Sequence, residues 1–160
     1  MLTGFVGRGL FEESSFDAVI CINAINHLPD RPRLLAEWHR VLKPGGHLLF
    51  TDRIVLTGPI TNKEIAVRAS IGVFVFVPAG LDQVLLDQGG FEVERVVDRT
   101  PNMANNAAGW RNARSKREVD LRAIEGDETF DGQQRFLEIT ADLAKEQRLS
   151  RIAILARRRS

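Results

Sequence analysis

The most constraining feature of this chain is a strand–helix–strand pattern within its first third. Residues 16–22 form an almost continuous apolar run that favours a buried β-strand. A helix is predicted next, because apolar residues at positions 34, 35, 38, 41 and 42 share one helical face. Asp30 can cap the start of this helix, and the Pro-Gly-Gly segment at 44–46 ends it. With a second strand at 47–51, the pattern predicts a βαβ unit whose two strands are parallel.

The rest of the chain continues the alternation of helices and strands. Thr61 and Glu64 match a capping box, so we expect a short helix that turns Ile65, Ala66 and Ala69 inward. Residues 73–77 fit either a strand or a buried helix. The remaining elements are predicted as a helix at 81–88, a strand at 91–97, a long helix from 103 to 124, a helix around 136–143 and a strand at 149–156.

These elements predict an α/β fold with a single domain at residues 1–160. We expect a partial Rossmann-like, doubly wound sheet of about four strands, of which the last is antiparallel. Residues 103–146 form a helical insertion before the final strand, and we expect this insertion to act as a lid.

Composition excludes several classes of function. The 160 residues carry a net charge of +1, which gives no overall attraction to nucleic acid or to a membrane surface. No apolar run approaches the roughly 20 residues of a membrane-spanning helix. Cys21 is the single cysteine and the three histidines lack metal-ligand spacing, so neither a disulfide nor a metal site is predicted. We expect a cytoplasmic protein without nucleic-acid, membrane or metal partners.

Four consecutive stretches carry the functional signal. They are Phe16-Asp17-Ala18-Val19, the loop NAINHLPD at 23–30, the helix and stop LLAEWHRVLKPGG at 34–46, and LLFTD at 48–52. In this order they resemble the middle of a class I S-adenosylmethionine-dependent methyltransferase of the type 11 kind, and residues 85–98 resemble a later part of that fold. The resemblance implies that a methyl group is transferred from S-adenosylmethionine to a small-molecule acceptor.

The loops after the two parallel strands are the expected ligand site. Ligands of open α/β sheets bind beyond the carboxyl ends of the strands, so both loops should face one crevice. By resemblance, the loop after the first strand contacts the methionine part of the cofactor. Asn23, Ala24, Ile25 and His27 are therefore candidate cofactor contacts, although Asn23 could equally satisfy backbone groups of its own loop.

His27 and Asp52 are the candidate catalytic residues. Either side chain could accept a proton from the methyl acceptor, and His27 is the first choice because its ordinary pKa lies near neutrality. The alternatives are a packing histidine and a turn-forming acid after a strand.

Arg53, Phe74, Phe76 and Trp110 are the candidate substrate-binding residues. Arg53 follows Asp52 at the same expected edge of the sheet. The three aromatic residues could line an acceptor pocket, and they would suit the hydrophobic core as well.

The resembled family begins with a strand, a GxGxG-type loop and an acidic residue that binds the cofactor ribose, and none of these is found here. Gly7-Arg8-Gly9 lies too close to the strand at 16–22, and the stretch from Gly4 to Gly7 contains no acid. We therefore expect an N-terminally truncated methyltransferase-like domain, for which cofactor binding by the chain alone is in question. Two alternatives stay open: a partner chain that supplies the missing half, or a non-catalytic methyltransferase-like binding or assembly protein.

The missing elements also leave the Phe16–Ile22 strand at the edge of the sheet. An edge strand with apolar residues on both faces favours pairing with another chain, so we expect self-association through this strand.

Overall fold

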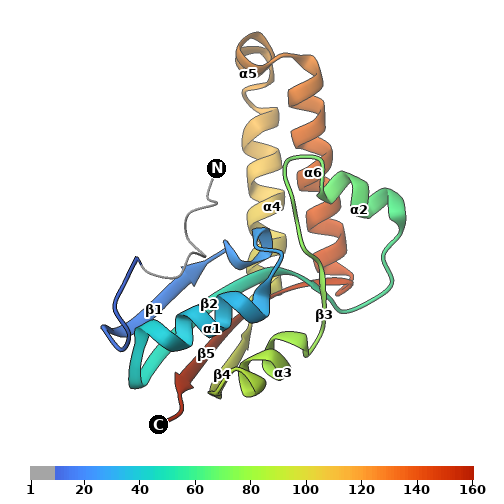
Figure 1. The fold of residues 1–160 in the computed structure, drawn as a ribbon. Helices are drawn as coiled ribbons and strands as arrows, with labels where there is room; N and C mark the ends of the chain where they lie inside the picture. Colours follow the sequence, from blue (N-terminus) through green and yellow to red (C-terminus); the bar gives the residue numbers. More distant parts are fainter. Residues whose placement is uncertain (1–9) are drawn as a thin grey trace.

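The computed structural model describes residues 10–160 as an open sheet with helices against one face and a helical tower at one end (Figure 1). The strand order is β1-β2-β5-β4, and the short β3 pairs with β2. The strands are β1 (Phe16–Ile22), β2 (Leu42–Leu56), β3 (Val77–Pro78), β4 (Phe91–Asp98) and β5 (Leu149–Arg158). The helices are η1 (Ile25–His27, a single 3-10 turn), α1 (Arg31–Val41), α2 (Asn62–Arg68), α3 (Leu81–Gln88), α4 (Thr100–Ser115), α5 (Glu118–Glu125) and α6 (Asp127–Lys145).

The predicted βαβ unit is confirmed. β1 and β2 are parallel, with Ile22 opposite Thr51, and α1 connects them. Asp30 caps α1 as expected, because its side chain accepts a hydrogen bond of 3.1 Å from the backbone N–H of Arg33. The expected common edge is not formed, because β2 continues from Thr51 to Leu56 while β1 ends at Ile22. Asp52 and Arg53, expected in the loop after the second strand, lie within β2, beside the end of β1.

β2 is much longer than the predicted 47–51 strand. It starts at Leu42, directly after α1, and the Pro-Gly-Gly segment forms an irregularity at which the pairing passes from Phe16–Leu42 to Ala18–His47. Gly45 has φ of 75°, in the left-handed region. A Cβ at Gly46 would lie 2.9 Å from the carbonyl oxygen of Lys43, so only glycine allows this close approach.

β5 is antiparallel to both β2 and β4, which confirms the expected direction of the last strand and the α/β class. Residues 73–76 form neither a strand nor a helix, and only Val77 and Pro78 pair with β2. The described sheet thus has the expected four long strands and one additional two-residue strand.

The main core lies between the sheet and the pair α1 and α3. Both helices belong to one cluster of buried side chains, to which Leu35 of α1, Leu86 of α3 and Phe50 of β2 contribute. β1 is the outer strand of the sheet, and its Ile20 and Ile22 are 68% and 52% exposed. An apolar strip on β1 is therefore open to solvent, on the face opposite to Val19 and Cys21, which pack on the core.

The insertion between β4 and β5 forms the tower, in which α4 and α6 lie side by side (Figure 1). The predicted single helix from 103 to 124 is wrong, because the chain breaks at Lys116 and Arg117 into α4 and α5. α4 and α6 pack through Ala107 and Phe136, and the base of the tower packs on Ile54 of β2. Among the described helices, none is long and apolar enough to cross a membrane.

The predicted inward face of α2 is also wrong. Ile65 is only half-buried and Ala66 and Ala69 are exposed, whereas Arg68 is 1% exposed. The helix is turned this way because Arg68 Nη1 donates a 2.7 Å hydrogen bond to Thr140 Oγ1 of α6.

The start of α2 is fixed by a capping box and an ion pair. Thr61 Oγ1 accepts from the N–H of Glu64 at 3.2 Å, and Glu64 Oε2 accepts from the N–H of Thr61 at 2.8 Å, as the sequence predicts. Arg148, between α6 and β5, donates to both Glu64 oxygens at 2.8 and 3.0 Å. The hydrogen bonds from Arg148 and Thr61 lower the pKa of Glu64 from 4.5 to about 2.

We expect Glu64→Gln to remove an acid-dependent part of the stability. Because the folded state lowers this pKa, Glu64 contributes stability that is present above pH 4.5 and is lost as pH falls through about 2. The glutamine still caps α2, so only the effect of the charge is removed. The melting temperature should fall below wild type at neutral pH because the ion pair with Arg148 is lost, and the difference should shrink on acidification. Glu128→Gln, at an exposed position of α6, is the control. A Glu64→Gln difference that does not depend on pH would contradict this prediction.

Candidate functional site

The loop after β1 is hydrogen-bonded to Thr51, which lies within the neighbouring strand β2. The backbone N–H of Asn23 donates to Thr51 Oγ1 at 2.9 Å, and this hydroxyl donates to Asn23 Oδ1 at 3.0 Å. Asn23 has φ of 54°, a conformation that asparagine and glycine tolerate best. The bonds fix Asn23 at the rim of the sheet and leave its amide nitrogen without a partner among the described residues.

The next residues of the loop divide into exposed and buried positions. Ala24 is exposed, whereas Ile25 and Asn26 are fully buried. Ile25 belongs to the core cluster beneath α1, so its side chain faces away from the rim and only its backbone could meet a ligand. Asn26 accepts from the N–H of Val75 through its carbonyl at 2.9 Å, and this bond brings the 73–76 segment across the loop.

His27 is exposed and is held by the same segment. Its Nδ1 lies 2.7 Å from the carbonyl oxygen of Val73, and its ring centroid lies 4.8 Å from that of Phe74. Because a carbonyl oxygen can only accept, Nδ1 carries the hydrogen in this contact. The neutral ring therefore has its free lone pair on Nε2, where it could accept a proton.

Asp52 is buried and ion-paired. Its Oδ2 lies 2.7 Å from Arg31 Nη1, and the same nitrogen lies 2.6 Å from Asp82 Oδ1 at the start of α3. Each of these three side chains is at most 3% exposed. Burial raises the pKa of Asp82 although Arg31 lies against it. Asp52 therefore joins structural elements, and its geometry does not suit contact with an acceptor.

Arg53, the residue after Asp52, lies on the opposite side of the strand, over Phe74. Its guanidinium carbon lies 5.4 Å from the Phe74 ring centroid, and that of Arg68 lies 5.6 Å from the same centroid. Arg68 also lies 4.3 Å from the ring centroid of Phe136. The structure thus brings together three of the residues predicted from sequence, His27, Arg53 and Phe74.

Phe76 and Trp110 take no part in these ring contacts. Phe76 packs against the core cluster at the base of the tower, as Phe74 also does. Trp110 is 65% exposed on α4 and is absent from the described core clusters. Neither residue has a ring contact with His27 or Phe74 in the described part of the chain.

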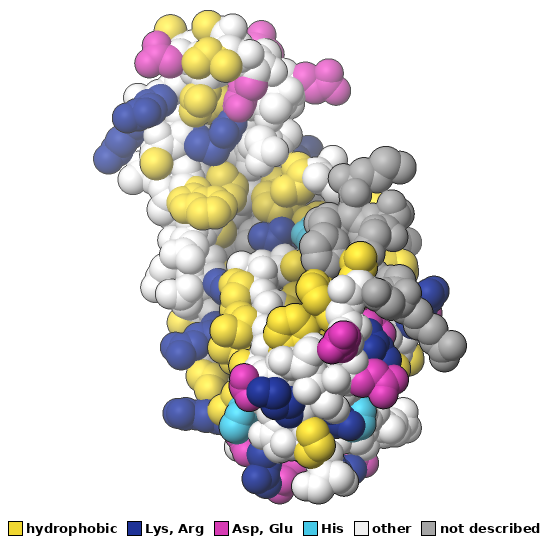
Figure 2. Space-filling model, turned by 60° about the vertical axis from the view of Figure 1, so that its left-hand side comes forward, with side chains coloured by type: hydrophobic (Ala, Val, Ile, Leu, Met, Phe, Trp, Pro, Cys, Tyr) yellow, Lys and Arg dark blue, Asp and Glu magenta, His cyan; other side chains and the backbone are white. Residues whose placement is uncertain are grey.

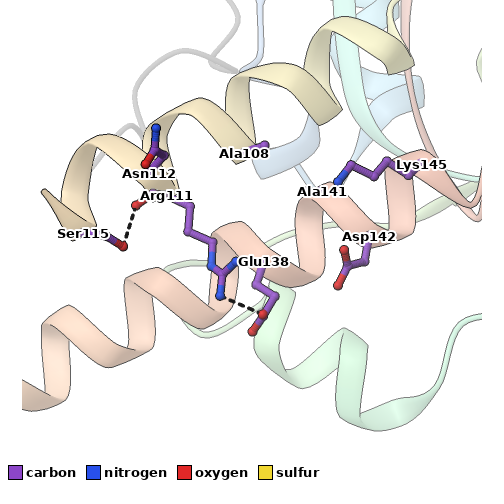
Figure 3. Close-up of a pocket in the computed structure, with 8 residues that line it drawn as sticks. All are labelled: Ala108, Arg111, Asn112, Ser115, Glu138, Ala141, Asp142 and Lys145. Carbon is purple, nitrogen blue, oxygen red and sulfur yellow. Dashed lines mark hydrogen bonds and ion pairs between the residues drawn. The ribbon is translucent and has the colours of Figure 1, made fainter.

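A separate shallow pocket lies between α4 and α6 and contains none of these residues (Figure 3). Arg111 Nη2 pairs with Glu138 at 2.8 Å across it, and Ser115 Oγ donates to the Arg111 carbonyl at 3.1 Å. Arg111, Ser115 and Glu138 of its lining are therefore partnered within the tower.

Comparisons with known proteins agree on one family. A family model described as a methyltransferase domain matches residues 7–50. The 27-O-demethylrifamycin SV methyltransferase of Amycolatopsis mediterranei is 32% identical over 91 residues, which cover 55% of this chain and 34% of that protein. The phthiotriol/phenolphthiotriol dimycocerosates methyltransferase of Mycobacterium leprae is 55% identical over 42 residues, which cover 26% and 16%.

Solved structures show the same fold. The chain matches phosphoethanolamine N-methyltransferase 2 of Haemonchus contortus, solved with phosphomonomethylethanolamine and S-adenosylhomocysteine, with a TM-score of 0.81 at 21% identity. That match covers 94% of this chain and 35% of the other. The cyclopropane synthase MmaA2 of Mycobacterium tuberculosis matches with a TM-score of 0.83 at 19% identity, over 92% of this chain and 57% of the other.

The chain resembles the class I S-adenosylmethionine-dependent methyltransferases. It spans about a third of the length of the rifamycin-type methyltransferase and less of the mycobacterial one. The resemblance stated from the sequence motifs is thus confirmed, and so is the fold class.

Among the described residues of this methyltransferase-like chain, the loop after β1 fits contact with the methionine part of S-adenosylmethionine, the cofactor that the family uses. Asn23 offers an unpartnered amide beside the exposed Ala24. The loop between β1 and α1 contains no glycine, so it offers no phosphate-type cradle there. Three glycines near the start of the chain were compared with the GxGxG-type loop of the family. They are Gly4, Gly7 and Gly9, and they lie outside the described residues.

Sequence reasoning missed Arg31, Asp82, Arg68 and Phe136 in this methyltransferase-like site. Arg31 and Arg68 lie on short amphipathic helices, where a charged residue normally faces solvent. Their partners are 51 and 72 residues away in the chain, so no local pattern could have indicated them.

We expect Arg31→Met to lower the free energy of unfolding by about 3–5 kcal/mol, because it leaves two buried carboxylates without their cation. Urea denaturation measures this change. Arg33→Met, at an exposed position in the same helical turn, is the control and should stay within about 0.5 kcal/mol of wild type. Equal stability of the two variants would show that the buried ion cluster is not needed.

Proposed function

We propose that this chain is part of an S-adenosylmethionine-dependent methyltransferase that acts on a small-molecule acceptor. The observation that carries the proposal is the loop after β1, which is held by Thr51 of β2 and by the Val73 carbonyl and presents Asn23 and His27 beyond the end of β1 in a methyltransferase-like sheet. The curated relatives, named as methyltransferases of a rifamycin and of phthiotriol dimycocerosates, support an acceptor of this class.

The bound cofactor would supply a methyl group on a positively charged sulfur, which is already an activated leaving group. The remaining tasks are alignment of the acceptor and exclusion of water. Asn23 is the proposed contact for the methionine part of the cofactor. Ala24, Ile25 and His27 would contribute mainly through the backbone of their loop.

His27 is the proposed base where the acceptor must lose a proton. The Val73 carbonyl holds Nδ1–H at 2.7 Å, so the ring is oriented and Nε2 is left to accept the proton. Phe74 and Arg53 would bind the acceptor beside it. The tower, residues 103–146, is the proposed lid over this acceptor. Trp110 lies on its exposed surface.

The test is a titration of the chain with S-adenosylhomocysteine up to millimolar concentrations, followed by NMR amide shifts. We expect the shifts of residues 23–28 to change, because they form the proposed cofactor rim. Unchanged shifts in this loop at saturation would contradict the proposed function. Tighter binding of reduced nicotinamide cofactor would also contradict it, because that result would indicate an oxidoreductase.

Asn23→Gly sharpens the test, because glycine keeps the left-handed backbone and removes only the carboxamide. Loss of one hydrogen bond should raise the dissociation constant about three- to tenfold. Asn112→Ala, at an exposed position of α4, should leave the affinity unchanged.

We also propose self-association through β1. This property would also be expected under the alternative function, a non-catalytic binding or assembly protein. β1 pairs only with β2 in the described sheet, and Ile20 and Ile22 are exposed. These features support pairing with a second copy.

We expect wild-type protein to associate with rising concentration in sedimentation velocity. The double variant Ile20→Lys/Ile22→Lys should remain monomeric, because charges on an edge strand oppose pairing. Val119→Lys/Ile124→Lys is the matched control, since these α5 residues are 83% and 82% exposed. A monomeric wild type, or equal behaviour of the two double variants, would refute the proposed interface.

A further inference from the structure

Three arginines gather where the tower meets the sheet, and we call them the arginine cluster: Arg53 of β2, Arg68 of α2 and Arg151 of β5. Arg53 and Arg68 lie over the same Phe74 ring, at 5.4 and 5.6 Å from its centroid. Burial, and then the neighbouring charge of Arg151, lower the pKa of Arg53. Arg53 is therefore close enough to both Arg68 and Arg151 for their charges to repel its own.

No carboxylate of residues 10–160 is in contact with the arginine cluster, although the charge of Asp52 partly offsets the lowering of the Arg53 pKa. None of its members takes part in an ion pair of the described chain. The Nε atoms of all three are buried without a hydrogen-bond partner. Asp52, the acid next to Arg53 in the chain, is already paired with Arg31 at 2.7 Å.

Arg68 makes this arrangement costly for the fold. It is 1% exposed, and burial followed by the charge of Arg53 lowers its pKa to about 9. The side chain therefore stays charged at neutral pH although only Thr140 accepts a hydrogen bond from it. Residues that reduce stability in this way are typical of binding sites, where a ligand supplies the missing partner.

We propose that the arginine cluster binds the oxyanion group of the methyl acceptor, a phosphate or a carboxylate. Guanidinium groups bind both through paired N–H donors. Arg53 and Arg151 are half-buried and can be reached from solvent, and Arg68 adds its charge from behind. Only the identity of the ligand as the acceptor rests on the proposed function; the binding of an anion does not.

The surroundings fit such a ligand. Phe74 and Phe136 hold the Arg68 guanidinium in place through their rings. His27, the candidate base, lies against Phe74 at 4.8 Å between ring centroids, so an acceptor held by the cluster would have its reacting end near the cofactor rim. In Figure 2, basic and histidine side chains lie next to each other at the waist between tower and sheet, bordered by hydrophobic atoms.

The test compares melting temperatures in inorganic phosphate, in acetate and in chloride at equal ionic strength. We expect a rise of about 4 °C or more in at least one of the first two relative to chloride, because a ligand that binds only the folded state stabilises it. The anion that gives the larger rise identifies the group. No rise over chloride in either anion would overturn the proposal.

Arg68→Met separates binding from structure. Methionine keeps an apolar stem next to both rings, and the Thr140 hydroxyl keeps its 2.6 Å bond to the Phe136 carbonyl. We expect the variant to melt at or above wild type in chloride and to lose the rise in the stabilising anion. Arg33→Met, with the same change of charge at an exposed site, should keep the rise. A less stable Arg68→Met variant with an unchanged rise would show that Arg68 is only structural.

NMR of the arginine Nε–H groups gives a direct second measurement. The Nε–H signal of Arg68 should shift when the stabilising anion is added, and unaffected signals of Arg53, Arg68 and Arg151 would overturn the proposal. The S-adenosylhomocysteine titration keeps the two proposals apart. Anion binding without shifts at residues 23–28 would remove the methyltransferase function and leave the anion site, and the reverse result would remove only the anion site.

Discussion

The arrangement of the site depends on one buried guanidinium, that of Arg31. It lies 2.7 Å from Asp52 of β2 and 2.6 Å from Asp82 of α3, and its second nitrogen donates to the Val75 carbonyl at 3.3 Å. Arg31 thus holds four parts of the fold together at one point: the start of α1, β2 at Asp52, the start of α3 and the 73–76 segment. Because isolated buried charges are strongly unfavourable, these elements have little freedom to separate. The position of His27 follows, since the same segment holds its ring.

The sequence-level prediction succeeded where structure is governed by short-range patterns. The helix face beginning at Leu34, the cap at Asp30 and the capping box at Thr61 are read from neighbouring residues, and the structure contains all three. It failed where distant contacts decide the outcome. α2 turns Arg68 inward to meet α6, and the helix expected through residue 124 breaks at Lys116, although the local periodicity indicates otherwise.

The same division applies to the candidate site. Asn23 and His27 were predicted by resemblance from their place after a strand, and the structure puts them in the loop beyond the end of β1. Asp52 was expected after its strand but lies within β2, and its burial depends on Arg31 and Asp82, which no motif connects to it. Arg53 was expected by position alone. Its proximity to Arg68 arises only when α2 and α6 fold back over the sheet, so the arginine cluster could not be found before the fold was known.

α6 links the tower to the charge at the site. Within one turn of this helix, Phe136 stacks on the Arg68 guanidinium and Thr140 accepts its hydrogen bond. A tilt of α6 relative to the sheet would therefore carry the cation with it and change the electrostatic potential over Phe74. The orientation of the tower is therefore coupled to ligand binding at the site. Mutations far out on the tower helices can alter ligand binding without contacting the ligand.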